Sequence, residues 1–307
     1  MITVLGSANI DYVCYTERIP ALGETVAGTS FLVAAGGKGA NQAVAAAKLG
    51  VRTVLLTKLG REDPYSGLLT DGFRAAGVDV SRVGYEQGCC GCALIMVDRQ
   101  ARNIIGIVPN ANARISVEYL EENRALIEGS RVLVAEFGVP LATVEHALAL
   151  ARRAGVSTLV NPAPALALSD RFYEDVDVVV PNETEAEALC GQRLSGPDCL
   201  REAAGFFHSR KVPHVVITLG EKGAFVSSGR RSQLIPAFPV KTVDTTGAGD
   251  AFVGGLACAL DEGKDIFTAA VFANAAAALS VTRPGAARSM PARAEVEQLL
   301  GGRRADG

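Results

Sequence analysis

The sequence predicts an α/β fold: a three-layer core with a central, mostly parallel sheet between helices, and a small β-sheet, named the lid below, projecting from it. From residue 115 onward, short apolar runs alternate with helical stretches, which is typical of strands joined by crossover helices. Two earlier segments, 12–33 and 86–108, show short β-like runs and no long helix. We therefore assign residues 1–11, 34–85 and 109–307 to the core, and 12–33 and 86–108 to the lid.

The elements of the core and of the small sheet follow in chain order. The apolar run 2–6 predicts the first strand, and an Ala-rich helix over 41–49 follows the glycine pair Gly36 and Gly37. Further strands are expected at 51–56, 92–97, 103–108, 132–136, 157–160, 176–180, 215–219 and 233–243, and further helices at 65–76, 116–127, 141–153, 183–190, 198–209 and after Gly249. Ligands of such sheets bind beyond the carboxyl ends of the strands, so functional residues are expected after strands.

The amino-acid composition limits the kinds of ligand and the cellular location that we expect for this protein. Of 307 residues, 49% are apolar and 21% are charged, and the net charge is −3. The chain has no excess of basic residues that would favour binding to nucleic acid or to an anionic membrane. Any phosphate group must therefore be bound by a local motif. The sequence contains no apolar run long enough to predict a transmembrane helix, and the first residues do not resemble a signal peptide. Seven scattered cysteines, an odd number, are typical of a reducing cytosol, which predicts a cytoplasmic protein.

The strongest local motif is Asp-Thr-Thr-Gly-Ala-Gly-Asp-Ala-Phe at 244–252. Gly247 and Gly249 allow close approach of a ligand, and free N–H groups at the following helix start favour a phosphoryl group. Asp250 in that first turn can accept a proton from an attacking hydroxyl. An ordinary helix N-terminus explains the same residues, and the motif alone leaves both interpretations open. It is neither a Walker loop nor a dinucleotide fingerprint, because no Gly-Lys-Ser/Thr follows and Phe252 replaces the third glycine.

Other motifs occur in order across nearly the whole chain. They are Asn-Ile-Asp at 9–11, Gly-Gly-Lys-Gly-Ala-Asn-Gln-Ala at 36–43, Asn-Pro-Ala-Pro-Ala at 161–165, Pro-Asn-Glu-Thr-Glu-Ala-Glu at 181–187, Thr-Leu-Gly-Glu-Lys-Gly at 218–223 and Val-Thr-Arg-Pro-Gly-Ala at 281–286. Together with the 244–252 turn they resemble the signatures of the ribokinase-like (PfkB-type) carbohydrate kinases. The resemblance implies a Rossmann-like core with a β-sheet lid, MgATP as phosphoryl donor and activation by potassium.

The resemblance also implies roles for individual residues. The catalytic set is Asp250 as base with the amides of Gly247, Ala248 and Gly249, and the sugar-binding set is Asn9, Asp11, Gly37, Lys38, Gly39, Asn41 and Asp250. The nucleotide would contact Asn182, Thr218, Gly220, Gly223, Gly249 and Asn274. Magnesium would be organised through water by Asn182 and Glu185, and potassium would be held by Asp244, Thr246, Ser280, Arg283, Gly285 and Ser289.

Simpler interpretations accompany several of these residues. Asn9 and Asp11 also fit an ordinary turn, and Lys38 fits a solvated loop. The acidic residues after Asn182 also fit a favourable first helical turn, and Asn274 fits a polar helix face.

Two departures from the family pattern affect the sugar. Gly138 stands two residues before Pro140, where these kinases usually carry a sugar-binding Glu. Glu136 faces the same side of an extended segment, roughly 6–7 Å along it, so it either replaces that Glu or the pocket is enlarged. Asn110 replaces a usual glycine before Ala-Asn.

The activity implied is ATP-dependent transfer of the γ-phosphoryl group to the 5-hydroxymethyl of ribose or a ribose-like pentose. The alternatives are a nucleoside kinase of the same superfamily and a non-catalytic sugar- or nucleotide-sensing protein on this fold. A homodimer through the lid is expected, because exposed sheet edges require a partner.

Overall fold

The computed structural model describes residues 1–100, 102–194 and 196–305. Four positions of the predicted core and lid, 101, 195, 306 and 307, lie outside the described residues. Within the described ranges, no helix has the length and apolar character needed to cross a membrane.

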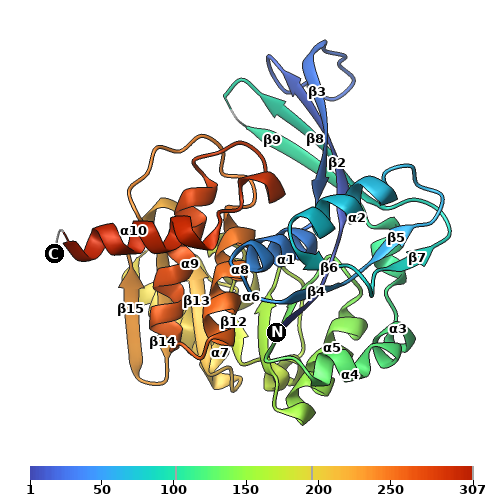
Figure 1. Cartoon of the computed structure of the whole chain (residues 1–307). Coiled ribbons are helices and arrows are strands. Elements are labelled where there is room, and N and C mark those ends of the chain that lie inside the picture. The colour runs from blue at the N-terminus through green and yellow to red at the C-terminus, as the bar shows by residue number, and fades with distance from the viewer. Residues whose placement is uncertain (101, 195, 306–307) are drawn as a thin grey trace.

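A nine-stranded sheet forms the centre of the core, in the order β15-β14-β13-β12-β11-β10-β1-β4-β6 (Figure 1). Its strands are β1 Ile2–Leu5, β4 Thr53–Leu56, β6 Val78–Asp79, β10 Val132–Glu136, β11 Ser157–Asn161, β12 Val178–Val179, β13 His214–Thr218, β14 Ala224–Ser228 and β15 Arg231–Ile235. The pairings from β6 to β13 are parallel, and only β13-β14 and β14-β15 are antiparallel. The predicted, mostly parallel sheet is confirmed.

Helices cover both faces of this sheet. One face carries α1 Lys38–Lys48, α2 Ser66–Ala75, α8 Ala248–Asp261, α9 Ile266–Ser280 and α10 Arg293–Ala305. The other carries α3 Val117–Glu122, α4 Arg124–Glu128, α5 Leu141–Ala154, α6 Glu183–Cys190 and α7 Pro197–Ser209. This arrangement is the three-layer core that the alternation of strands and helices predicts.

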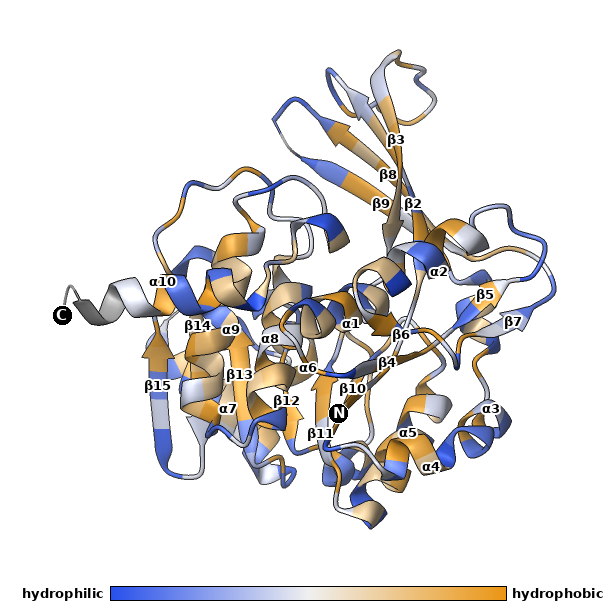
Figure 2. Cartoon of the chain, viewed as in Figure 1, coloured by the Kyte–Doolittle hydropathy of each residue, from blue (hydrophilic) through white to orange (hydrophobic). Residues whose placement is uncertain are grey.

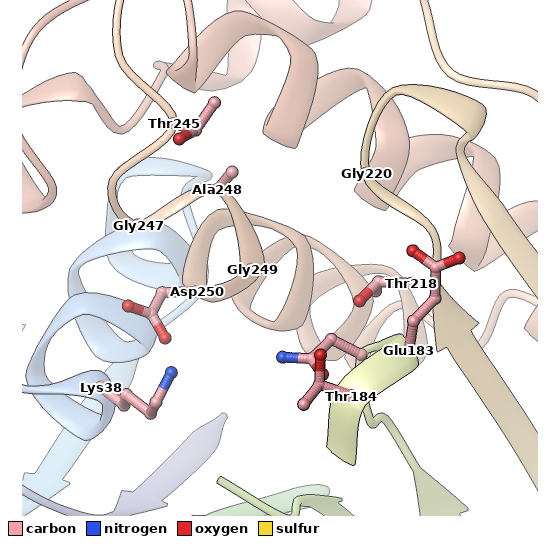
Figure 3. Close-up of a pocket in the computed structure, with 11 residues that line it drawn as sticks. Lys38, Glu183, Thr184, Thr218, Gly220, Thr245, Gly247, Ala248, Gly249 and Asp250 are labelled. Carbon is pink, nitrogen blue, oxygen red and sulfur yellow. The ribbon is translucent and has the colours of Figure 1, made fainter. Parts of the chain in front are cut away.

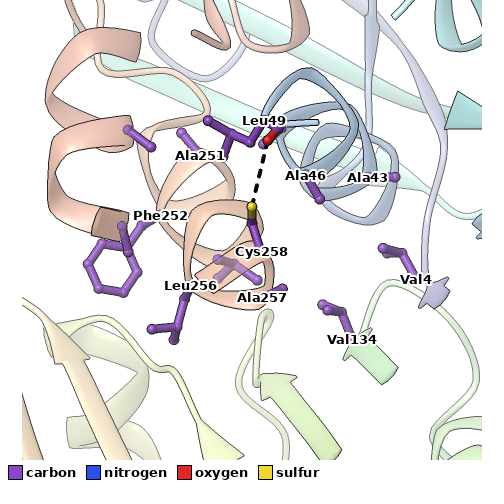
Figure 4. Packing of buried hydrophobic residues seen from close by; sticks show 14 of the residues in the cluster. Val4, Ala43, Ala46, Leu49, Val134, Ala251, Phe252, Leu256, Ala257 and Cys258 are labelled. Atoms are coloured by element: carbon purple, nitrogen blue, oxygen red, sulfur yellow. Dashed lines mark hydrogen bonds between the residues drawn. The ribbon is translucent and has the colours of Figure 1, made fainter. Parts of the chain in front are cut away.

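The apolar strands supply both layers of the core. Val4 and Val134 pack under α1 and α8, while their neighbours Leu5 and Leu133 pack on the opposite face (Figure 4). A strand buried on both sides has no polar face, because successive side chains point to opposite faces. The inner strands of the large sheet are accordingly mostly apolar, whereas the edge strand β15, which begins Arg-Ser-Gln, is largely hydrophilic (Figure 2).

A second sheet, in the order β3-β2-β8-β9, projects from one side of the core (Figure 1). Its strands are β2 Asn9–Thr16, β3 Gly28–Gly36, β8 Gly91–Asp98 and β9 Asn103–Val108, and a two-stranded sheet of β5 Lys58–Gly60 and β7 Gly84–Glu86 lies beside its base. β2 begins three residues before the predicted 12–33 segment and β3 ends three residues after it. The small sheet therefore reaches down to Asn9 and Asp11, which lie on a strand and not in a turn.

Several elements differ from their predicted bounds, and three of the differences have a clear local cause. Helix α1 begins at Lys38, because Gly37 adopts a φ of 92° and starts the helix three residues before position 41. The run 233–243 leaves the sheet after Ile235, where Pro236 has no N–H to donate to a ladder. The helix predicted over 116–127 is divided at Asn123, whose side chain donates to the Tyr119 carbonyl at 2.8 Å.

Close packing of α1 on the end of β1 depends on Gly39. A Cβ at this position would lie 2.5 Å from the Gly6 Cα and 2.8 Å from the Ser7 nitrogen, both backbone atoms. We expect Gly39→Ala to lower the free energy of unfolding by about 1–3 kcal/mol, because the two backbones must separate. Urea unfolding measures this change. Gly72→Ala on α2 is the control, because nothing lies within 4 Å of a Cβ there, and equal stability of both variants would contradict the close contact.

Candidate active site

The order of the strands predicts where a ligand binds. From β1 the chain runs to β4 and β6 on one side, and β10 to β15 continue the sheet on the other. The connections therefore diverge between β1 and β10, and such a divergence opens a crevice beyond the carboxyl ends of the strands. Asn9 follows β1, and α1 and α8 begin at the same edge.

Asp250 lies in the first turn of α8 and is 6% exposed. Its Oδ2 accepts a hydrogen bond from Asn41 Nδ2 at 2.9 Å, and its Oδ1 accepts one from Gln42 Nε2 at 3.1 Å. Burial raises the pKa of Asp250, and the positive charge of Lys38 and the two amide donors oppose that rise. A carboxylate with a raised pKa, held by two donors at a cavity, has the properties of a general base.

A cavity of about 380 Å³ lies in front of this carboxylate. It is lined by Lys38, Asn182, Glu183, Thr184, Thr218, Gly220, Thr245, Gly247, Ala248, Gly249 and Asp250. The side chains of Lys38 and Asp250 point toward each other across one end (Figure 3). The charge of Asp250 raises the pKa of Lys38, which keeps the ammonium protonated beside the start of α8.

The start of α8 carries the anion-binding geometry. Gly247 caps the helix with a φ of 77°, a conformation that favours glycine, and a Cβ there would lie 3.0 Å from Ala286. The first N–H groups of an α-helix have no acceptor within the helix, and those of α8 begin at the cavity. Together with Lys38, this end of the cavity suits a transferring phosphoryl group.

Asn9 and Asp11 reach the site from the small sheet. Asn112 Oδ1 accepts from the Ala8 N–H at 3.1 Å, so the Asn112 amide must donate through its Nδ2 to Asn9 Oδ1, at 2.8 Å. Asn9 is left with its own NH₂ group free to donate. Asp11 offers acceptors only, and burial, with the charge of Asp250, raises its pKa to about 6. The pair thus presents a donor and a carboxylate side by side, as recognition of hydroxyl groups requires.

Two glycines make room for these groups. A Cβ on Gly36 would lie 2.1 Å from Asp11 Oδ2, and a Cβ on Gly91 would lie 2.1 Å from Asn112 Nδ2. Any larger side chain at either position would displace the carboxylate or the amide. The placement of Asn9 and Asp11 therefore depends on three strands, because Asp11 is on β2, Gly36 ends β3 and Gly91 begins β8.

Glu136 does not reach the cavity, contrary to the expectation that it replaces a sugar-binding Glu. Its exposed fraction is zero, and its carboxylate accepts from the Ser7 N–H and, at 2.6 Å, from the Gly138 N–H. A Cβ on Gly138 would lie 2.7 Å from Ser7 Oγ. Because β10 continues up to Glu136, its side chain points into the protein, where it ties the ends of β1 and β10 together.

At the other end of the cavity, Asn182 and Glu185 form a capping box at the start of α6. Asn182 Oδ1 accepts from the Glu185 N–H at 2.8 Å, and Glu185 Oε2 accepts from the Asn182 N–H at 2.9 Å. Burial raises the pKa of Glu185, and the charge of Asp250 adds to that rise. Glu183 and Thr184 line the same end, next to Thr218 and Gly220.

Two residues of the expected nucleotide set lie away from the cavity lining. Asn274 is 5% exposed, and its amide donates to the Ile235 carbonyl at 3.1 Å. Gly223 adopts a φ of 98°, and a Cβ there would lie 2.1 Å from the Ile235 oxygen. Asn274 thus holds the end of β15 in place, and Gly223 leaves room for that strand end.

The expected potassium ligands gather partly around Asp244. Its Oδ1 accepts from the N–H and hydroxyl of Thr246 at 2.9 and 2.7 Å, and its Oδ2 accepts from the Gly285 N–H at 2.8 Å. Burial alone would raise the pKa of Asp244, but these hydrogen bonds outweigh it and hold the pKa below its usual value. Ser289 donates to the Ala286 carbonyl at 2.8 Å, and the Ser280 carbonyl accepts from the Arg283 N–H at 3.3 Å.

The sequence analysis predicts no role for three further residues, Gln42, Asn112 and Asn161. Gln42 donates a hydrogen bond to Asp250, Asn112 donates one to Asn9, and Asn161 accepts one from Gln42. All three are buried amides. Gln42 and Asn161 lie inside the motifs described above, and a buried polar side chain next to a catalytic motif is the signal that would have found them.

Fold and site together are typical of a small-molecule kinase of the α/β class: a helix start suited to a phosphoryl group and a buried carboxylate meet at one cavity, and the Asn9–Asp11 pair lies close enough for the charges of Asp11 and Asp250 to interact. The family model described as pfkB family carbohydrate kinase matches residues 1–293. The chain belongs to this family, and is therefore a phosphotransferase with an alcohol acceptor, as the resemblance implied.

The relatives agree over almost the whole chain. A ribokinase of Haemophilus influenzae is 40% identical over 300 residues, covering 97% of this chain and 98% of the relative. A deoxyribokinase of Salmonella typhi is 36% identical over 303 residues, covering 97% and 98%. The structure of Arabidopsis thaliana ribokinase complexed with ribose and ATP matches with a TM-score of 0.90 at 31% identity, covering 97% of this chain and 98% of that one. The predicted ribokinase-like fold class is confirmed.

Proposed function

We propose that this protein transfers the γ-phosphoryl group of ATP to the 5-hydroxymethyl of ribose or a ribose-like pentose, with Asp250 as the general base. The observation that carries the proposal is the buried Asp250 carboxylate, which faces Lys38 across the cavity at the start of α8. The ribokinase and deoxyribokinase relatives support a pentose acceptor.

Each residue has a defined task in this reaction. Asn9 donates to sugar oxygens, Asp11 accepts from sugar hydroxyls, and Asn41 lies at the reacting hydroxyl through its hydrogen bond to Asp250. Asp250 accepts the proton of the attacking hydroxyl as the new O–P bond forms. The amides at Gly247–Gly249 and the Lys38 ammonium stabilise the charge on the transferring group.

The nucleotide end fits a magnesium ion. Glu183 and Asp250 are carboxylates that line the cavity, Glu185 lies beside it, and burial raises the pKa of both Glu185 and Asp250. Magnesium keeps several waters and needs few protein ligands, so Asn182 and Glu185 would hold its waters. When bound with ATP, the ion supplies charge neutralisation for the phosphates.

The substrate is tested by ATP-to-ADP turnover against D-ribose, 2-deoxyribose, a set of hexoses and a set of nucleosides, with magnesium and potassium present. We expect turnover with a pentose. Turnover of hexoses alone would overturn the proposal, and turnover of nucleosides alone would assign the protein to the nucleoside kinases. ATP binding with no acceptor turned over would favour a sensor.

Sugar affinity should depend on the charge of Asp11. Its pKa in the free protein is about 6, so its carboxylate loses its acceptor character as the pH falls below that value. We expect the Kd for the pentose, measured by calorimetry without ATP, to approach a roughly tenfold rise per pH unit below the pKa. Asp11→Asn should bind weakly with no such rise. An unchanged pH dependence in that variant would exclude Asp11 as the titrating group.

Potassium should activate the enzyme through the loop around Asp244. We propose that the Asp244 carboxylate, the carbonyls of Thr246, Ser280, Arg283 and Gly285, and the Ser289 hydroxyl hold the ion. The loop leads directly into Gly247, so a bound cation would stabilise the turn that starts α8. We expect turnover to fall several-fold when potassium is replaced by tetramethylammonium. Equal rates in potassium, sodium and tetramethylammonium would refute the assignment.

The small sheet is the proposed lid and dimer interface. Its exposed side chains include Phe31 at 65%, Ile107 at 61% and Leu94 at 57%, and an apolar surface of this kind favours a second copy of the chain. A gel-filtration mass near that of a monomer at every concentration would contradict the dimer. The cytoplasmic location stays a prediction from the cysteine content.

A further inference from the structure

Two neighbouring carboxamides on α1 contact the Asp250 carboxylate from one side. Asn41 Nδ2 donates to Oδ2 and Gln42 Nε2 donates to Oδ1, at 2.9 and 3.1 Å. Gln42 has an exposed fraction of zero. It therefore cannot touch a substrate, and any effect on the reaction must act through the residues that it bonds, Asp250 and Asn161.

The direction of the Gln42 amide is fixed by a chain of hydrogen bonds that starts at a backbone carbonyl. The Val180 oxygen can only accept, so Asn161 donates to it through Nδ2, at 2.9 Å. Asn161 Oδ1 then faces Gln42 Nε2, at 3.1 Å. Both N–H bonds of Gln42 are thus committed to oxygen acceptors, one on Asn161 and one on Asp250. If the Gln42 amide were rotated by half a turn, its oxygen would face the Asn161 and Asp250 oxygens, and both hydrogen bonds would be lost.

This arrangement leaves acceptors on the same two residues unpaired. Among the residues that the structure describes, the buried side-chain atoms without a hydrogen-bond partner are Asn41 Oδ1, Gln42 Oε1 and Thr57 Oγ1. Two of the three belong to the amides that donate to Asp250. A buried acceptor without a partner is unfavourable, and an apolar side chain would avoid it. The amides are therefore oriented to serve the carboxylate and not their own oxygens.

We propose that Gln42, anchored by Asn161, is the positioning residue that fixes the Asp250 carboxylate toward the acceptor hydroxyl. Oδ1 is held by a donor that cannot rotate, so the plane of the carboxylate is set before substrate binds. The inference rests on the proposed function, because it concerns the base of that reaction. It also links the base to Val180, which leads through Pro181 to Asn182 at the nucleotide end.

The same hydrogen bond favours the ionised base. The charged groups that face Asp250 are Lys38 on α1, Asp11 on β2 and Glu185 on α6, and they are unchanged when Gln42 is replaced. Loss of a donor to the carboxylate raises its pKa. When kcat is plotted against pH, its fall at low pH, the acidic limb, must therefore move to higher pH in a variant that lacks this donor.

The test is Gln42→Met, which keeps the length of the side chain and removes the donor. After wild-type turnover has been established with a pentose, we expect kcat to fall about 10- to 100-fold with both KM values within about threefold. The acidic limb should move up by roughly half to one pH unit. Asn123→Leu is the matched control, because Asn123 is a buried amide whose side chain donates to the Tyr119 carbonyl, away from Asp250, and it should leave the limb in place.

The outcomes separate the two proposals. Absence of acceptor turnover in the wild type refutes the proposed function. A wild-type enzyme that turns over, with a Gln42→Met variant that loses thermal stability but keeps kcat and the acidic limb, refutes the positioning role alone. If Gln42→Met does not fold, Asn161→Leu replaces it. That variant should shift the limb in the same direction by a smaller amount, and an unshifted limb refutes the proposal.

Discussion

Asp250→Asn should lower turnover about 10²- to 10⁴-fold, the range typical of losing a general base. The amide cannot accept the hydroxyl proton, while its size keeps the first turn of α8 intact. The measurement is ATP-to-ADP turnover with the best pentose at saturating concentrations, together with the Kd of the pentose. Because the pKa of Asp250 is raised by burial, wild-type kcat should also fall as the pH drops through that pKa, and the variant should not show this limb.

Asp71→Asn is the control for this substitution, because Asp71 is an exposed residue on α2 that pairs with Arg74. It should turn over at the wild-type rate. If Asp250→Asn kept activity within about threefold of the wild type, the base would have to be another group.

Lys38→Met should produce the second largest loss. The ammonium points toward the carboxylate base at the cavity that the start of α8 lines, where charge develops during transfer (Figure 3). Removing one such charge-stabilising group costs about 10²- to 10³-fold in kcat. Lys38 also opposes the rise in the Asp250 pKa, so the acidic limb should move to higher pH in the variant.

Lys211→Met is the matched control, because Lys211 is exposed and pairs with Glu174 on the surface. It should change neither kcat nor the pH profile. A Lys38→Met enzyme with normal kcat and a raised KM for the sugar alone would assign Lys38 to sugar binding, and not to phosphoryl transfer.

The sequence by itself determined the fold class and the position of the phosphoryl-binding turn. Both are local properties. Apolar runs of strand length that alternate with helical stretches predict parallel strands with crossover helices, and polar motifs that follow those strands must meet at one edge of the sheet. Gly247 and Asp250 are neighbours in the chain, so their motif could be interpreted without knowing any distant contact.

Tertiary structure alone decided how the side chains are used. Asn41 and Asp250 are 209 positions apart, and their hydrogen bond exists only because α1 packs beside α8. Glu136 seemed available for the sugar because an extended segment places it on the right side, but the folded chain encloses it between two backbone amides. Asn274 matched a nucleotide contact, and its amide instead holds β15. Burial and partners decide which atoms face the cavity, and hydrogen bonds between residues far apart in the chain leave no pattern in a single sequence.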